Sequence, residues 1–281
     1  MAQRRYCAAA HHTHSHTIAA QNTTLSEMEF FALQINTQID LQVIIQVVAA
    51  FVCGSIPFGV LIAKSKGVNL RAVGSGNVGA TNVGRALGRK WGFICFALDA
   101  LKGALPVLIT GQINGVLGRP VNTISSTALT MWIVIAIAAI AGHIFSPWLK
   151  FKGGKGVATG FGALVAMWPV LTFPMLIALA VWIACMKLSR IVSLSSLIAA
   201  LTLPFSAALL LPWNMPAQIV AAPAPTTPLE TTTGTPLPAV IACALIAMLV
   251  FITHRANIKR LLLGTESRVG HKPKPSDTIT L

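Results

Sequence analysis

Long apolar runs constrain the fold of this chain more than any other feature of its sequence. One membrane crossing needs about 20 apolar helical residues, and on that basis we predict spans near 41–63, 91–111, 127–148, 192–212 and 237–254. The composition agrees, because 54% hydrophobic residues, 10% charged residues and a mean hydropathy of +0.73 do not describe a soluble domain. The chain is therefore predicted to be an all-α, multi-pass integral membrane protein.

A further apolar stretch, 157–187, is too long for a single crossing. Its 31 residues would extend about 46 Å as one helix, whereas the hydrocarbon core is about 30 Å thick. Pro169 and Pro174 lie in the middle of the stretch, where a helix break is expected. We therefore predict a hairpin of two short helices, which raises the count to about seven transmembrane helices.

The basic residues indicate how these helices are oriented. Of the 21 Lys and Arg residues, 17 fall on one predicted face, whereas Arg4, Arg5 and Arg119 oppose them and Lys102 lies inside the second span. Because cytoplasmic loops collect basic residues, the amino terminus is predicted to be external and the carboxyl terminus cytoplasmic. This topology, together with anionic headgroups, explains most of the net charge of +14, and no nucleic-acid partner is predicted.

Three segments flank or interrupt a membrane domain predicted at 41–268. Residues 1–40 form a polar extension, expected to be disordered, whose histidines at 11–16 resemble a tag or tail more than a metal site. Residues 216–236 are a Pro/Thr-rich external loop, and 269–281 form a tail. The five cysteines show no paired spacing, so neither a disulfide framework nor a zinc site is predicted.

A first polar segment follows the first span and reads Gly-Ser-Gly-Asn-Val-Gly-Ala-Thr-Asn at 74–82. Interpreted as a helix that begins near Ser75, it places Asn77, Thr81 and Arg85 on one polar stripe, which ends in a guanidinium able to bind phosphate with two hydrogen bonds. The alternative is an interfacial helix whose small residues only pack against their neighbours. Ser75 is also consistent with a simple helix cap.

A second segment, 150–160, is rich in lysine and glycine and follows the span that carries His143. Glycines let successive backbone N–H groups converge on an anion, and lysines add positive charge. The segment lacks the Walker pattern of nucleotide-hydrolysing P-loops, but a general phosphate cradle is predicted. Its expected ligands are Lys152, Gly153, Gly154, Lys155, Gly156 and Thr159. His143 belongs either to this site or to the core, as a hydrogen-bonded histidine at a helix end.

A third segment, 254–266, lies at the exit of the last span. Positive-inside bias explains its Arg and Lys residues, but not His254 and Asn257, which share a helical face. Glu266 is expected to anchor the terminal helix, and Asp99 with Lys102 to form a structural ion pair inside the second span. The predicted topology brings all three segments to the cytoplasmic face, so the function should involve a phosphorylated ligand.

These segments resemble the three signatures of the bacterial PlsY-type acyl-phosphate:glycerol-3-phosphate acyltransferases, in the same order, over roughly 45–268. The resemblance implies a seven-helix enzyme of the bacterial inner membrane with its active site on the cytoplasmic face. Such an enzyme moves a fatty acyl group from acyl phosphate to the sn-1 hydroxyl of glycerol 3-phosphate, which gives lysophosphatidic acid and phosphate, in the first acylation of phospholipid synthesis. The implied partners are these two substrates and membrane lipids, and no cofactor is implied.

The resemblance also implies which residues take part in the reaction. An acyl phosphate has a good leaving group, so the attacking hydroxyl needs orientation and an oxyanion donor more than a strong base. Backbone N–H groups of the glycine loop are candidate donors. A histidine or the substrate's own phosphate is the candidate proton acceptor. The catalytic candidates are Ser75, Arg85, His143, Lys155, His254 and Asn257.

The main alternative is a transporter or channel for an anionic phosphorylated solute, which helix breaks and clustered cations would suit. Against it, the polar residues concentrate at one face and the glycine-lysine segment has no repeat elsewhere in the sequence. A third interpretation is a lipid-binding scaffold with polybasic loops. Such a scaffold has no need of Ser75, Asn77 or His254.

Overall fold

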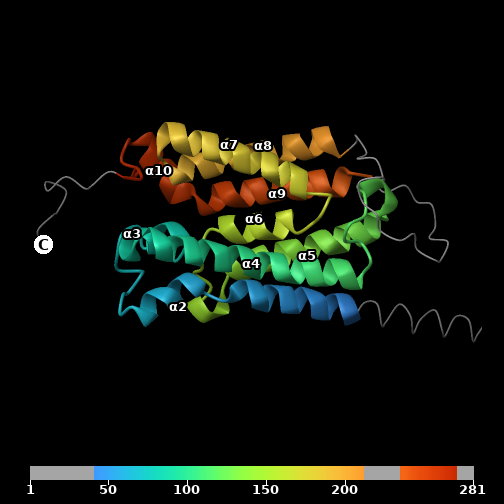
Figure 1. The fold of residues 1–281 in the computed structure, drawn as a ribbon, viewed down its shortest axis with the longest axis horizontal. Coiled ribbons are helices and arrows are strands. Elements are labelled where there is room, and N and C mark those ends of the chain that lie inside the picture. The colour runs from blue at the N-terminus through green and yellow to red at the C-terminus, as the bar shows by residue number, and fades with distance from the viewer. Residues whose placement is uncertain (1–40, 212–234, 271–281) are drawn as a thin grey trace, which may run out of the picture. The chain divides into compact units, whose positions relative to one another are not determined.

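The structure, a computed structural model, describes residues 41–211 and 235–270, and every regular element in those ranges is helical (Figure 1). Residues 41–55 are helical, and 3-10 turns occupy Val121–Thr123 and Pro147–Leu149. The remaining helices are α2 (Phe58–Ser65), α3 (Ala80–Leu87), α4 (Arg89–Ile113), α5 (Ser126–Ile144), α6 (Val157–Val165), α7 (Thr172–Ser189), α8 (Val192–Leu210), α9 (Leu237–Thr253) and α10 (Arg255–Leu262).

The predicted all-α class is confirmed, whereas three predicted segments fall wholly or mostly outside the described residues. These are the polar extension at 1–40, nearly all of the Pro/Thr-rich loop at 216–236, and the tail from 271 onward. From Gln46 onward the described residues form one compact unit. The site and the inferences below lie within that unit.

The long apolar runs form helices where the sequence predicted them. Those long and apolar enough to cross a membrane are Leu41–Ser65, Arg89–Ile113, Ser126–Leu149, Thr172–Ser189 and Val192–Leu210. A sixth candidate consists of α9 and α10 together, although the pair is bent by 63°. The α6 helix has nine residues, about 14 Å at 1.5 Å per residue, too few to span a bilayer by length alone. The count of seven and the orientation of the termini stay predictions.

The stretch from 157 to 187 forms the two helices that its length and prolines predicted. The first, α6, ends at Val165, and the second, α7, begins at Thr172. Pro169 lies in the break between them, and Pro174 lies in the first turn of α7, where its missing N–H removes no helical hydrogen bond. The hairpin is therefore confirmed.

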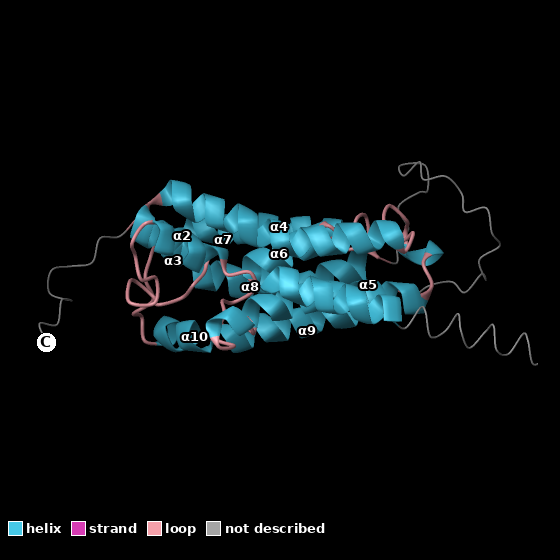
Figure 2. Cartoon of the chain, turned by 90° about the horizontal axis from the view of Figure 1, so that it is seen from below, coloured by secondary structure: helices cyan, strands magenta, loops and turns pink. Residues whose placement is uncertain are grey.

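The short α6 helix packs against α4, α5 and α7, and none of its residues is exposed. Both ribbon views draw it beside α4 (Figures 1 and 2). Two glycines permit this approach, because a Cβ atom added to Gly103 would overlap the carbonyl oxygen of Thr159, and one added to Gly162 would overlap that of Ala100. Small residues allow such close backbone contact between membrane helices.

Two ends of this helical unit differ in character. At one, which we call the basic end, lie α2, α3 and α10, with α10 on the other side of the unit from α2 and α3 (Figures 1 and 2), and these helices and the loops beside them carry many of the Lys and Arg residues. At the other, which we call the far end, the loop 114–125 meets the α6–α7 connection, where the N–H of Gly118 donates to the carbonyl of Trp168 over 2.9 Å. The glycine-rich segments belong to the basic end.

Candidate active site

Lys155, just before α6, is the start of a polar network at the basic end. Its Nζ donates to Asn257 Oδ1 on α10 over 2.5 Å, and Asn257 Nδ2 donates to Glu266 Oε1 over 2.6 Å. Glu266 also accepts from Ser193 Oγ on α8 over 2.7 Å and from Arg260 Nε over 2.6 Å. The network therefore ties the start of α6 to α8 and α10, and Glu266 makes the anchoring contacts that the sequence predicted for it.

The charges of this network favour an anion. Burial lowers the pKa of the Lys155 ammonium to about 8; the charge of Glu266 opposes this shift, whereas the charges of Arg260 and Arg85 add to it. Burial raises the pKa of Glu266, but its three hydrogen bonds and the charge of Arg260 outweigh burial and hold that pKa below its usual value. Lys155 thus lies among the charges of two arginines and one carboxylate, which leaves an excess of positive charge.

The start of α6 adds backbone donors to these charges. Gly156 caps the helix with a φ of +80°, a left-handed conformation that favours glycine. The first N–H groups of a helix have no intrahelical acceptor, and the helix dipole makes this end partly positive. Thr253 of α9 bonds the carbonyl of Lys155 over 3.4 Å and helps to fix this position. An ammonium beside a helix N-terminus is an arrangement suited to phosphate.

Two of the N–H groups that the sequence assigned to an anion are used elsewhere. The N–H of Gly153 donates to the carbonyl of Ile144 over 2.9 Å, and that of Gly154 donates to the carbonyl of His143 over 3.1 Å. These carbonyls belong to the last turn of α5, where helices leave acceptors unpaired. The cradle predicted over the whole glycine run therefore does not hold for these two N–H groups, which fasten the loop to α5.

Two other predicted phosphate ligands, Lys152 and Thr159, do not join the Lys155 network. The side chain of Lys152 is exposed, and its carbonyl accepts from Arg71 Nη2 over 2.5 Å. Thr159 is fully buried at the close contact between α4 and α6, beside Gly103. Arg71 thereby links the first polar segment to the second, and Thr159 packs between helices.

The first polar segment does not form the helix predicted from Ser75. Residues 74–79 are irregular and α3 begins only at residue 80, because Gly74 and Gly76 adopt φ values of +57° and +67° that end helical geometry. Asn77 therefore precedes α3 and does not share a helical stripe with Arg85. Arg85 lies in the last turn of α3 with an exposed side chain, and its charge acts on the Lys155 ammonium.

Asn82 holds this segment together, a role that its position in the sequence does not indicate. Its side chain is 1% exposed. The Oδ1 atom accepts from the N–H of Ser75 over 2.9 Å, and Nδ2 donates to the carbonyls of Leu70 and Val73, each over 3.0 Å. One buried amide thus fixes the loop that carries the exposed Ser75 side chain.

The third segment bends at His254, which separates α9 from α10. His254 and Asn257 are both buried, but His254 lies at the corner and not within a helix, so the helical face predicted for the pair is interrupted there. His254 Nδ1 lies 2.8 Å from the carbonyl of Val250. Because a carbonyl only accepts, Nδ1 carries the proton in this bond and Nε2 is the nitrogen left to accept one.

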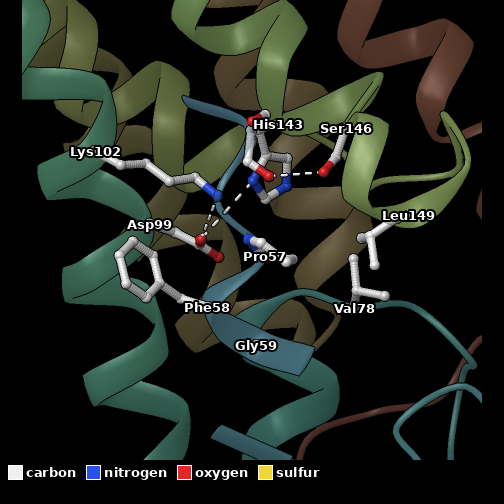
Figure 3. Close-up of a pocket in the computed structure, with 10 residues that line it drawn as sticks. Pro57, Phe58, Gly59, Val78, Asp99, Lys102, His143, Ser146 and Leu149 are labelled. Carbon is white, nitrogen blue, oxygen red and sulfur yellow. Dashed lines mark hydrogen bonds and ion pairs between the residues drawn. The ribbon is translucent and has the colours of Figure 1, made fainter. Parts of the chain in front are cut away.

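A second polar cluster lies deeper in the unit (Figure 3). Lys102 Nζ and Asp99 Oδ1 are 2.8 Å apart, so the predicted ion pair forms, and Lys102 also donates to the carbonyl of Ile56 over 2.6 Å. His143 Nδ1 lies 3.8 Å from Asp99 Oδ1. These three side chains line a cavity of about 10 Å³, which has room for about one water molecule. No hydrogen bond or ion pair between the described residues joins this cluster to the side chains of the Lys155 network.

Comparison with known proteins identifies the family. Residues 44–264 match the glycerol-3-phosphate acyltransferase family model. The chain is 37% identical to the glycerol-3-phosphate acyltransferase of Desulforamulus reducens over 227 residues, which cover 80% of this chain and 94% of that relative. It is 39% identical to that of Aquifex aeolicus over 224 residues, or 79% and 96% of the two chains.

Solved structures give the same answer. Two crystal structures of PlsY, an integral membrane glycerol 3-phosphate acyltransferase, match with TM-scores of 0.65 for the glycerol 3-phosphate form and 0.64 for the lysophosphatidic acid form. They are 35% and 34% identical to this chain and cover 82% of it and 96% of their own length. This all-α integral membrane protein therefore belongs to the glycerol-3-phosphate acyltransferase family.

Proposed function

We propose that this chain transfers a fatty acyl group from acyl phosphate to the sn-1 hydroxyl of glycerol 3-phosphate, at the cytoplasmic face of the bacterial inner membrane. The observation that carries the proposal is the Lys155–Asn257–Glu266 network at the start of α6. It joins Lys155 through Asn257 to Glu266 and Arg260 beside a helix N-terminus, and the charge of Arg85 acts on Lys155, which suits substrates that both carry phosphate. Membership of the glycerol-3-phosphate acyltransferase family supports the acceptor.

The two phosphates call for two groups of ligands. We assign the phosphate of the acyl donor to the first turn of α6, where backbone N–H groups and Lys155 converge, because its acyl chain must continue into the bilayer. We assign the phosphate of glycerol 3-phosphate to Arg85, with Ser75 as a neighbouring hydroxyl from the same segment. Arg85 and Lys155 are close enough for their charges to interact, so the two phosphates would be held side by side.

The reaction itself requires little acid–base help. The sn-1 oxygen forms a bond to the acyl carbon, the bond from that carbon to the phosphate oxygen breaks, and inorganic phosphate leaves with the bonding electrons. Backbone N–H groups at the start of α6 would stabilise the oxyanion. The hydroxyl proton passes either to His254 Nε2 or to a substrate phosphate. We do not assign this role to His143, because its side chain is 7% exposed and its ring lies against Gly154.

The decisive experiment is acyl transfer by the purified protein in lipid, with radiolabelled glycerol 3-phosphate and either palmitoyl phosphate or palmitoyl-CoA. We expect labelled lysophosphatidic acid from palmitoyl phosphate only, and a loss of about 100-fold or more in Lys155→Ala. Lys187→Ala, which removes an exposed lysine from the end of α7, is the matched control. Equal use of palmitoyl-CoA would overturn the donor assignment, and uptake of label into vesicles without product would favour the transporter.

Two refinements test the finer claims. Chromatography against authentic 1-acyl and 2-acyl standards checks the position of the acyl group, and the 1-acyl product is expected. Inverted and right-side-out membrane vesicles, both supplied with impermeant glycerol 3-phosphate, check the face. Activity confined to the inverted vesicles is expected, and activity confined to the right-side-out vesicles would refute the cytoplasmic placement.

A further inference from the structure

The last helix, α10, turns sharply away from the span that precedes it. The 17 residues of α9 extend about 26 Å at 1.5 Å per residue, close to the thickness of a hydrocarbon core of about 30 Å. The next helix is bent by 63° from α9, so its eight residues advance only about 5 Å further in the direction of α9. The axis of α10 therefore stays close to the depth at which α9 leaves the hydrocarbon.

The side chains of α10 differ around the helix. Asn257 is buried and bonds Lys155, so its side faces the protein. Ile258 and Leu262, four positions apart, share an apolar side, on which Ile258 is partly exposed and Leu262 is 84% exposed. Ala256 and Arg260 lie roughly opposite that apolar side, because successive residues of a helix are about 100° apart. The exposed apolar side therefore has a polar side across from it.

Two basic residues lie next to the apolar side. Arg255 and Lys259 are both exposed and are one turn apart, on the surface of α10 that faces away from Asn257. The ion pairs within residues 41–211 and 235–270 include neither of them. Exposed basic residues that flank an apolar side are typical of a helix that lies in the headgroup layer of an anionic membrane.

We infer that α10 is an interfacial helix that docks on anionic phospholipid. Ile258 and Leu262 enter the boundary between headgroups and acyl chains, and Arg255 and Lys259 bind the lipid phosphates. The carbon chains of these two basic residues lie along apolar surface while their charges reach the headgroups. The partner is therefore the surrounding leaflet, recognised by its negative charge and by its hydrocarbon.

The inference has a consequence for the Lys155 network. Asn257 and Arg260 belong to α10, and Glu266 follows it and bonds both. A helix held at headgroup depth holds these residues at that depth as well. The phosphate of an amphiphilic acyl donor lies there too, while its chain remains in the bilayer. Only this consequence rests on the proposed function, because the docking of α10 does not depend on which reaction the chain catalyses.

The first test measures the depth of α10 in a membrane. Leu262→Cys and the matched control Ala256→Cys are made in full-length protein that lacks its five natural cysteines. Each variant carries a nitroxide spin label in vesicles of phosphatidylglycerol. Oxygen concentrates in hydrocarbon and a nickel chelate stays in water, so the ratio of oxygen to nickel accessibility reports depth. We expect this ratio to be several fold higher at position 262 than at position 256.

Two results at position 262 would overturn the inference. Greater accessibility to nickel than to oxygen would place the apolar side in water, and exclusion of both reagents would mean that a protein surface covers it. Melting temperatures verify that the labelled proteins are folded. If the background without cysteines does not fold, Cys95 and Cys243 are retained, because both are buried, and only the other three are replaced.

The second test concerns the charge of the lipid. Near an anionic surface each basic residue strengthens binding by about fivefold. The label at position 262 should therefore move toward water in phosphatidylcholine vesicles, and also in phosphatidylglycerol when Arg255→Gln and Lys259→Gln are combined. Arg89→Gln with Lys90→Gln, an exposed pair at the start of α4, removes the same charge elsewhere and is the matched control. Equal depth in the two lipids, or an equal shift in the control, would overturn the assignment to anionic headgroups.

Failure of this inference can be told apart from failure of the proposed function. The spin labels report depth whether or not the protein transfers an acyl group. A wild type that makes no lysophosphatidic acid would overturn the proposed function and leave the docking of α10 as measured. A label at position 262 that faces water would overturn the docking and leave the acyltransferase assay unaffected.

Discussion

Two glycine-rich segments meet at the basic end, and their glycines are needed for different reasons. In the first, Gly74 and Gly76 supply left-handed backbone angles, and a buried amide from Asn82 holds the turn. In the second, Gly153 and Gly154 supply the absence of a side chain, so that the loop can lie directly on the end of α5. Gly76 is therefore required by its dihedral angle and Gly153 and Gly154 by the space around them, whereas Gly74 meets both requirements, because a Cβ atom there would also overlap Asn82 Oδ1.

The segments also contribute different cations. The first leads to Arg85, whose guanidinium keeps its charge at any physiological pH. The second contains Lys155, whose pKa burial lowers to about 8. A site built from both keeps part of its positive charge in alkaline solution and loses the rest.

The largest difference should appear between Gly153→Ala and Gly76→Ala. At Gly153 the new methyl group would overlap the backbone carbonyl of His143, which cannot move aside, so activity should fall by about 100-fold or more. At Gly76 the nearest atom is the carbonyl oxygen of Arg71 at 3.2 Å, so the cost is mainly the left-handed angle, about 1–2 kcal/mol of stability. Acyl-transfer rates and melting temperatures measure both, and equal losses of activity would break the comparison.

The second prediction concerns Asn82→Ala. This change leaves one N–H and two carbonyls of the first segment without their buried partner, so it should destabilise the protein by about 1–3 kcal/mol. Asn77→Ala is the control, because the Asn77 side chain bonds only the N–H of the next residue, over 3.0 Å. Thermal unfolding in detergent measures both variants. Matching shifts in melting temperature would mean that Asn82 is not what holds the turn.

The third prediction uses pH to separate the two cations. A phosphate site needs the protonated form of Lys155, which predominates below its pKa of about 8. For wild type, kcat/KM should therefore fall as the pH rises through 8, approaching about tenfold per pH unit above it. Lys155→Arg should show no such fall, since arginine stays charged. A decline of the same size in Lys155→Arg would assign the titration to another group.

The smallest effect is expected for Arg71→Ala, which removes the hydrogen bond between the two glycine-rich segments. Arg71 Nη2, in the first segment, donates to the carbonyl of Lys152, in the second, over 2.5 Å at an exposed position. Such a hydrogen bond contributes about 0.5–1.5 kcal/mol net, so Arg71→Ala should lower kcat/KM by a few fold and leave the melting temperature nearly unchanged. Arg89→Ala, at the start of α4, is the control. A loss as large as that of Gly153→Ala would make Arg71 part of the site itself.

The sequence predicted the helices well because bilayer thickness sets the length of an apolar run. Its prediction of the α6–α7 hairpin also held, since Pro169 and the excess length both required a break. The prediction of a helix from Ser75 was wrong, because Gly74 and Gly76 adopt left-handed backbone angles and residues 74–79 are irregular. Hydropathy and periodicity predict which face of a helix is buried, but they do not show at which glycine the backbone leaves the helical conformation.

The sequence predicted several residues of the site but not the hydrogen bonds that join them. Lys155, Asn257 and Glu266 were singled out, but their shared network could not be, because it joins segments more than 100 residues apart in the chain. Ser193 was missed, since a serine in an apolar helix carries no signal until Glu266 is seen to bond it. Asn82 was missed for the same reason, because its partners are backbone atoms that a sequence does not locate.

The short helix α6 affects on which side of the membrane the later helices, α7 to α10, begin and end. The chain leaves the basic end at Val157 and reaches the far end by Trp168, where it bonds Gly118. A span too short for its bilayer ordinarily distorts the surrounding lipid, but α6 is enclosed by α4, α5 and α7 and meets protein instead. The helix whose first turn we assign to the donor phosphate thus also reverses the direction of the chain. On the predicted count of seven crossings, in which α6 is one, its removal would leave six and turn α7 to α10 to the opposite side of the membrane, a change that a reporter fused to the carboxyl terminus would detect.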